Sequence, residues 1–263
     1  MKNFRNNLLR GVSILALLGG SYGLAQEKKE RHVFLLIGQS NMAGRAKIEV
    51  EDKKTIDGAF LWNIGKKKWE AAVPPYNLQS PSRKNVKMQQ LNCGPSFVNA
   101  YSEKHTGVEV GIVCAARGGT SIGQWDKKKP DNFDLYHHAI EATKAALAEG
   151  GELKGILWHQ GEGDSGEKNL PFYPEKLAQL IANLREDLKS PKLPFVYSQV
   201  GQWKPEYEGF NEMIVKQPAK IEGTACITTE GLKNFDDAHF NSAGQRELGE
   251  RFAVAMEKLL SDK

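Results

Sequence analysis

Apolar runs alternate with helical patterns along most of the chain. The run from His32 to Ile37 is almost continuously apolar and stops at Gly38, which is typical of a strand buried on both faces of a parallel sheet. Four later runs have the same character. The expected strands are 32–37, 108–115, 155–158, 195–200 and 225–228.

Between these runs, apolar residues recur three and four positions apart, as on one face of a helix. Strands that alternate with such helices predict an α/β fold, here a three-layer α/β/α sandwich with a mainly parallel five-stranded sheet. Residues 45–92 follow neither pattern, so we expect a long surface excursion that covers part of a site. The expected helices are 94–105, 134–149, 174–188, 208–218 and 242–260.

The first 25 residues have the composition of a secretory signal peptide. Lys2, Arg5 and Arg10 precede a short apolar stretch, and small residues stand at positions 23 and 25, so we expect cleavage after Ala25. An uncleaved amphipathic anchor is the alternative. We expect residues 26–31 to be a charged linker, residues 32–263 a single domain, and the protein to be exported to the periplasm or the extracellular medium.

Composition narrows the class of protein further. With 26% charged residues, 40% apolar residues and a mean hydropathy of −0.50, the chain is neither a polytopic membrane protein nor a disordered polyampholyte. Its formal charge is +4, but three of the basic residues belong to 1–25, and about +1 remains without them. A near-neutral mature protein gives no electrostatic reason to bind nucleic acid, and we expect no stable membrane insertion after cleavage.

The chain has an odd number of cysteines, Cys93, Cys114 and Cys226, and none of them lies close to another in sequence. In an exported protein, one disulfide with one buried thiol is possible, as are three thiols. Their spacing does not match a metal site, and it leaves the pairing open.

Polar clusters follow the expected strands at the points where those strands end. Ser40 follows the first strand, Gly118-Gly119 the second and Gln160 the third, while Asp236 and His239 precede the last helix. Because ligands bind beyond the carboxyl ends of the strands in such a sheet, these segments are expected to meet at one site.

The residue types in these clusters suit acyl transfer. Ser40, at a strand-to-helix turn, is the candidate nucleophile, although a serine there can also be a plain N-cap. His239 is the candidate base, and Asp236, three positions earlier, can hold its Nδ1 proton. Asp237 is a weaker contender for that role. The Gly-x-Ser-x-Gly elbow of α/β-hydrolases is excluded, because position 42 is methionine.

An acyl-transfer site also needs donors for the oxyanion. The backbone amides of Ser40 and Gly119 and the side-chain amide of Gln160 are the candidates. The alternative is that acidic and histidine side chains bind a metal, but no metal-ligand spacing supports it, so we expect neither metal nor cofactor. The residues considered as metal ligands are His159, Glu162, Asp164, Asp236, Asp237 and His239.

Four blocks of sequence resemble the SGNH (GDSL-like) hydrolases, specifically the branch that holds sialate O-acetylesterases and acetylxylan-active carbohydrate esterases. The resemblance covers about residues 32–260, nearly the whole expected mature chain. The blocks are Gly38-Gln39-Ser40-Asn41 with Met42-Ala43-Gly44, Gly118-Gly119-Thr120 with Trp125, Trp158-His159-Gln160-Gly161-Glu162, and Asp236 with His239.

This resemblance implies specific roles for these positions. Ser40 would be the nucleophile, His239 the base and Asp236 its orienting acid, with Ser40, Gly119 and Gln160 at the oxyanion hole and no metal. Substrate contacts or loop anchoring are implied for Gln39, Asn41, Arg117, Glu162 and Trp125.

The expected function is therefore that of a secreted serine esterase that removes O-acetyl groups from a carbohydrate through an acetyl-enzyme. One alternative is a non-catalytic carbohydrate-binding protein on the same scaffold. Another is an esterase for other short acyl esters. The aromatic side chains considered for sugar stacking are Trp125, Trp203, Tyr207 and Phe210.

Overall fold

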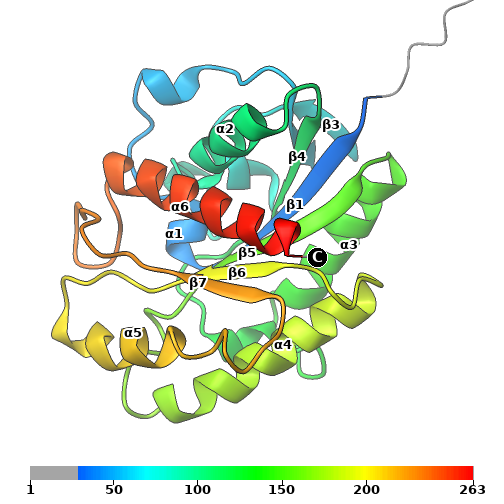
Figure 1. Cartoon of the computed structure of the whole chain (residues 1–263). Helices are drawn as coiled ribbons and strands as arrows, with labels where there is room; N and C mark the ends of the chain where they lie inside the picture. The colour runs from blue at the N-terminus through cyan, green and yellow to red at the C-terminus, as the bar shows by residue number, and fades with distance from the viewer. Residues whose placement is uncertain (1–28, 263) are drawn as a thin grey trace, which may run out of the picture.

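The computed structural model describes residues 29–262, and its strands form one sheet between two layers of helices (Figure 1). The strands are β1 Arg31–Gly38, β2 Ala59–Asn63, β3 Lys68–Ala71, β4 Glu109–Cys114, β5 Glu152–His159, β6 Phe195–Ser198 and β7 Thr224–Ile227. Their order is β3-β2-β4-β1-β5-β6-β7, and only β3 runs antiparallel to its neighbour. The expected α/β sandwich with a mainly parallel sheet is confirmed, and its five expected strands are all present. The expected signal peptide, 1–25, lies outside the described residues.

The sheet has seven strands, two more than the sequence pattern predicts. The additional strands, β2 and β3, form a hairpin within the excursion 45–92, which was expected to be irregular. Strand β2 has five residues and β3 only four, and β3 is a half-exposed edge strand without an apolar run. Pairing of β2 with β4 and edge-to-face packing of Trp62 on Trp69, with ring centroids 5.2 Å apart, stabilise the hairpin.

The expected helices are also present. The α-helices are α1 Ser40–Ala43, α2 Gly94–Lys104, α3 Leu135–Ala148, α4 Tyr173–Asp187, α5 Glu208–Ile214 and α6 Ser242–Ser261. Helices α2 and α6 cover one face of the sheet, and α3 and α4 cover the other (Figure 1). Short 3-10 segments lie at Glu51–Lys53, Tyr76–Gln79, Val86–Met88, Ile122–Trp125, Leu170–Phe172 and Pro205–Tyr207.

Strand β1 lies near the middle of the sheet and contributes to both cores. Val33, Leu35 and Ile37 belong to the core beneath α3 and α4, whereas Phe34 and Leu36 belong to the core beneath α2 and α6. All five side chains are fully buried. This two-sided burial explains why the strand is continuously apolar instead of alternating.

Two further observations concern the described part of the chain. All three cysteines, Cys93, Cys114 and Cys226, are free thiols, so none of them forms a disulfide. Of the two arrangements that the sequence left open, three thiols is the one observed. No helix within residues 29–262 is both long enough and apolar enough to cross a membrane.

Helices α2 and α6 approach each other closely at Gly249. A Cβ atom added at Gly249 would lie 2.3 Å from the carbonyl oxygen of Cys93 and 2.7 Å from the amide nitrogen of Phe97. Both neighbours are backbone atoms at the start of α2 and cannot rotate away. The contact therefore sets the position of α6, whose first residue, Ser242, follows the loop that contains Asp236 and His239.

Substituting Gly249→Ala is expected to lower the free energy of unfolding by about 1–3 kcal/mol, because the added methyl group overpacks this contact. Chemical denaturation measures the change. Gly166→Ala is the control, since nothing lies within 4 Å of a Cβ at Gly166, and its effect should stay within about 0.5 kcal/mol. Equal stability of the Gly249 variant and wild type would contradict the close packing.

Candidate active site

A cavity of about 520 Å³ lies beyond the carboxyl ends of the central strands; we call it the Ser40 cavity. It brings together Ser40 after β1, Gly118-Gly119 after β4, Glu162 after β5 and His239 after β7, as their positions in the sequence predict. The full lining is Gln39, Ser40, Arg45, Lys84, Met88, Gly118, Gly119, Thr120, Ser121, Gln124, Glu162, Gly163, Tyr207, Ala238 and His239.

Residues 38–41, the serine turn, are held against the end of β5. The Gln39 amide donates to the carbonyl oxygen of His159 at 2.9 Å, and a Cβ atom at Gly38 would lie only 2.1 Å from that oxygen. Gly38 also has φ of +140°, so only glycine fits there. The turn places Ser40 at the first residue of α1, where its hydroxyl makes no hydrogen bond to any described residue and faces the cavity.

Residues 234–240, the histidine loop, orient the imidazole of His239. Its Nδ1 lies 2.8 Å from Oδ2 and 3.0 Å from Oδ1 of Asp236. The same carboxylate accepts the backbone N–H groups of Ala238 and His239, both at 2.8 Å. Burial raises the pKa of Asp236, but its bond to His239 and these backbone donors outweigh burial and lower the pKa below 3.8. The carboxylate therefore stays charged at neutral pH and holds Nδ1.

Asp237 does not share this role. Its backbone carbonyl accepts the indole N–H of Trp203 at 2.9 Å, and its side chain makes no hydrogen bond or ion pair with His239. Of the two adjacent aspartates that the sequence left as contenders, Asp236 is the one bound to the imidazole.

Asn41 connects the serine turn to the histidine loop. Its side chain is fully buried, and Nδ2 donates one hydrogen to Glu162 at 2.6 Å and one to the carbonyl oxygen of Ala238 at 3.0 Å. Its Oδ1 accepts the backbone N–H of Phe240 at 3.2 Å. The amide of Asn41 is thus bonded on both sides of His239 and, through the chain, adjoins Ser40.

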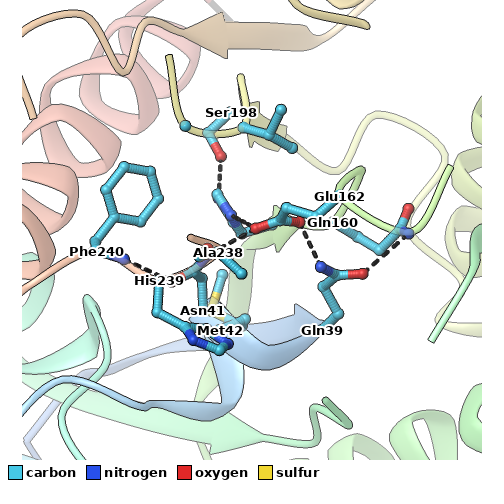
Figure 2. A network of polar contacts seen from close by, with 12 residues as sticks. Gln39, Asn41, Met42, Gln160, Glu162, Ser198, Ala238, His239 and Phe240 are labelled. Atoms are coloured by element: carbon cyan, nitrogen blue, oxygen red, sulfur yellow. Dashed lines mark hydrogen bonds and ion pairs between the residues drawn. The ribbon is translucent and has the colours of Figure 1, made fainter. Parts of the chain in front are cut away.

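Glu162 is the centre of this buried polar network (Figure 2). Its carboxylate accepts from Gln39 Nε2 at 2.5 Å and Asn41 Nδ2 at 2.6 Å, on either side of Ser40, and lies 3.0 Å from Nε2 of His159. His159 Nδ1 in turn lies 2.5 Å from the hydroxyl of Ser198 on β6. Burial raises the pKa of Glu162, but its interaction with His159 and the hydrogen bonds that it accepts outweigh burial and lower the pKa below 4.5. Gln39, Asn41 and Glu162 therefore position the serine turn.

The structure does not support Gln160 as an oxyanion donor. Its side chain is 1% exposed and does not line the Ser40 cavity. Its Nε2 donates instead to Asp164 at 2.7 Å and to the carbonyl oxygen of Thr120 at 3.0 Å. Rotating the amide would direct its oxygen at these two acceptors, so the orientation is fixed. Gln160 and Asp164 anchor the loop after β4, because Asp164 also accepts the N–H of Ile122 at 2.7 Å.

Two other predicted contacts are structural. Trp125 is 1% exposed and packs edge-to-face on Trp158 in the core, away from the Ser40 cavity, so it offers no surface to a sugar. Arg117 donates to the carbonyl oxygen of Ser82 at 2.6 Å and lies 3.4 Å from the ring centroid of Phe133. It therefore anchors the excursion, which was one of its two predicted roles.

The other aromatic candidates for sugar stacking differ in their exposure and in whether they line the Ser40 cavity. Phe210 is fully buried, and Tyr207 lines the cavity although it is only 5% exposed. Trp203 is half-buried against Phe240, outside the Ser40 cavity.

Sequence reasoning missed several residues of the cavity wall. Arg45, Lys84 and Met88 come from the excursion, which therefore does cover part of the site, as expected. Arg45 directly follows the Gly38–Gly44 block, and that position was the one available signal. Lys84 and Met88 lie in an irregular segment whose path the sequence pattern does not predict.

Four of the six candidate metal ligands form two separate pairs. His159 is bound to Glu162, and His239 is bound to Asp236. Across residues 29–262, no group of three or more His, Cys, Asp or Glu side chains is arranged to hold a metal ion.

The sequence profile of a family of known enzymes matches residues 30–258. That family is described as carbohydrate esterase, sialic acid-specific acetylesterase. The chain belongs to this family. It is a carboxylic ester hydrolase that acts on acetyl groups of carbohydrates, and the SGNH resemblance of its sequence blocks is confirmed.

Individual relatives agree with this membership. The Arabidopsis thaliana protein named "Probable carbohydrate esterase" is 26% identical over 264 residues, covering 90% of this chain and 97% of the relative. Its crystal structure has a TM-score of 0.77 and covers 88% of this chain and 99% of its own. NanS, at 15% identity, 89% and 99% coverage and TM-score 0.65, shares the fold. So does a carbohydrate acetylesterase from Xanthomonas citri, at 22% identity, 88% and 57% coverage and TM-score 0.67.

Substituting Glu162→Gln in this esterase is expected to lower the free energy of unfolding at pH 7 by about 3 kcal/mol, because His159 loses its buried charged partner. Since the pKa of Glu162 is below 4.5 in the folded state, its contribution is complete above about pH 4.5 and is lost as the pH falls through the lowered pKa. The difference between wild type and variant should therefore shrink in acid.

Urea unfolding between pH 3 and pH 7 measures this difference. Glu167→Gln is the matched control, because Glu167 is exposed and its side chain makes no hydrogen bond or ion pair with a described residue, so it should follow wild type throughout. A Glu162→Gln difference that stays constant, or that grows in acid, would contradict the charged state assigned to the network.

Proposed function

We propose that this carbohydrate esterase is a serine esterase that removes O-acetyl groups through Ser40, His239 and Asp236. The observation that supports the proposal is that Ser40 and His239, far apart in the sequence, line one cavity, while Asp236 holds Nδ1 of the imidazole. Nε2 of His239 has no hydrogen-bond partner among residues 29–262 and is free to accept a proton.

In the first half-reaction, the Ser40 hydroxyl attacks the acetyl carbonyl carbon. Its proton passes to Nε2 of His239, and the adjacent Asp236 carboxylate stabilises the imidazolium that results. The negative charge collects on the carbonyl oxygen, where the backbone N–H groups of Ser40 and Gly119 are the proposed donors. Collapse of the intermediate releases the sugar hydroxyl, which takes the proton from His239 and leaves Ser40 acetylated.

In the second half-reaction, water replaces the sugar. His239 accepts a proton from the attacking water, and the same donors serve the second oxyanion. Acetate leaves, and Ser40 regains its proton. The acetyl-enzyme is the covalent intermediate that this sequence of steps requires.

An acetylated carbohydrate is the proposed substrate. The family description and the names of the relatives support this class of substrate. The proposal also includes export to the periplasm or the extracellular medium, for which the basic, apolar and small-residue pattern of 1–25 is the support.

Ser40→Ala is expected to lower acetate release from acetylated xylan, acetylated sialic acid and 4-nitrophenyl acetate by at least about 10³-fold, because the attacking oxygen is absent. Circular dichroism and the melting temperature should remain those of wild type. Ser261→Ala, which removes an exposed hydroxyl at the end of α6 that does not line the Ser40 cavity, is the matched control and should keep wild-type turnover. Comparable rates in Ser40→Ala and wild type would refute the assignment.

A further inference from the structure

Arg45 extends its guanidinium group into the wall of the Ser40 cavity. Its Nη1 donates to two backbone carbonyl oxygens, that of Gly44 at 2.7 Å and that of Met88 at 3.1 Å. Its Nε and Nη2 have no hydrogen-bond partner in the part of the chain that the structure describes. Three of the five N–H donors of this rigid fork, on a side chain that lines the cavity, therefore have no acceptor among the described residues.

The charge of Arg45 is also uncompensated. No carboxylate of residues 29–262 lies within ion-pair distance of its guanidinium. The acids near the site are already engaged, since Glu162 is bound to His159 and Asp236 to His239. Burial lowers the pKa of Arg45 because the half-buried cation has lost solvent without gaining a negatively charged partner. A desolvated cation of this kind is costly unless a ligand supplies negative charge.

The free end of the fork lies beside the candidate nucleophile. A Cβ atom at Gly118 would be 2.3 Å from Nη2 of Arg45 and 3.3 Å from Cβ of Ser40. Nη2 therefore covers the Gly118-Gly119 turn next to Ser40, the region where the carbonyl oxygen of a bound acetyl group becomes negative. Lys84 approaches the same turn, 3.8 Å from a Cβ at Gly119, but its side chain is exposed and its charge more strongly screened.

The oxyanion also lacks a donor that the sequence blocks predicted. Gln160, the expected side-chain donor, is bonded to Asp164 and Thr120 and does not reach the cavity. We propose that Arg45 is a catalytic residue that donates from Nη2 to the acetyl carbonyl oxygen as that oxygen becomes an oxyanion. This role rests on the proposed serine-esterase function and adds a charged donor to the two backbone amides.

The first test removes the guanidinium and then returns it from solution. Arg45→Ala should lower kcat for 4-nitrophenyl acetate by about 10²–10³-fold, the usual effect of losing an oxyanion donor, and change KM little. Guanidinium chloride at millimolar concentration should then raise kcat of the variant at least about tenfold. Arg117→Ala is the matched control, because Arg117 does not line the cavity, and guanidinium should not raise its kcat.

A second measurement separates transition-state binding from structural support. Phenylboronic acid forms a tetrahedral anion on a reactive serine, so its affinity should fall in Arg45→Ala by about the same factor as kcat. A merely structural role would raise KM together with the loss of boronate affinity and would not respond to guanidinium. If Arg45→Ala does not fold, Arg45→Gln and Arg45→Lys are measured instead, with Lys expected to retain more kcat than Gln.

The outcomes distinguish the two proposals. Wild type that hydrolyses no acetyl ester overturns the serine-esterase function and the role of Arg45 with it. If wild type is active and the Arg45 variants keep its kcat, only the role of Arg45 is overturned. The same holds if the variants lose kcat but guanidinium does not restore it and boronate affinity is not selectively lost. Rescue together with a parallel loss of kcat and boronate affinity supports it.

Discussion

A buried carboxylate joins the segments from which the catalytic chemistry would come. Glu162, at the end of β5, binds the side chains of Gln39 and Asn41, and Asn41 binds the backbone on both sides of His239. Burying this charge is costly, and it is offset only because His159 and two amides surround the carboxylate. Asn41 therefore joins the serine turn directly to the histidine loop, and Glu162 holds that turn against the segment after β5.

The position of β1 makes this arrangement possible. The strand is buried on both faces near the middle of the sheet, so its carboxyl end is fixed against β4 and β5. At that end Gly38 lies against the carbonyl oxygen of His159 with no room for a side chain. The rigid sheet thereby fixes Ser40, while the longer histidine loop depends on Asn41 and on the packing of α6.

Much of the architecture could be predicted from the sequence because burial on both faces leaves a strong pattern. The apolar runs of the five expected strands and the main amphipathic helices are each visible in the local sequence. The hairpin of β2 and β3 was missed because its pairing with β4 is a long-range interaction that a short, half-exposed segment does not reveal. The hydrophobic pattern reveals which faces of strands and helices are buried, but it does not reveal which edge strands pair with the sheet.

Some residues of the candidate site could be predicted from the sequence, and others could not. Ser40, Gly119 and His239 could be placed together because each follows a strand of one parallel sheet. The orientations of Gln160 and Trp125 could not be predicted, because packing between loops decides whether an amide or an indole faces a cavity or the core. For the same reason only its position after the Gly38–Gly44 block pointed to Arg45, whose neighbours in space come from three separate segments.

A double-mutant cycle between Asn41 and His239 tests the linkage of the two loops most directly. In the wild-type background, Asn41→Leu, which is close in volume, should lower kcat/KM for 4-nitrophenyl acetate at least about tenfold, because the imidazole is displaced from the attacking hydroxyl. In the His239→Ala background the same substitution should cost less than about twofold. Equal losses in both backgrounds would show that Asn41 does not act through His239 and would contradict the linkage.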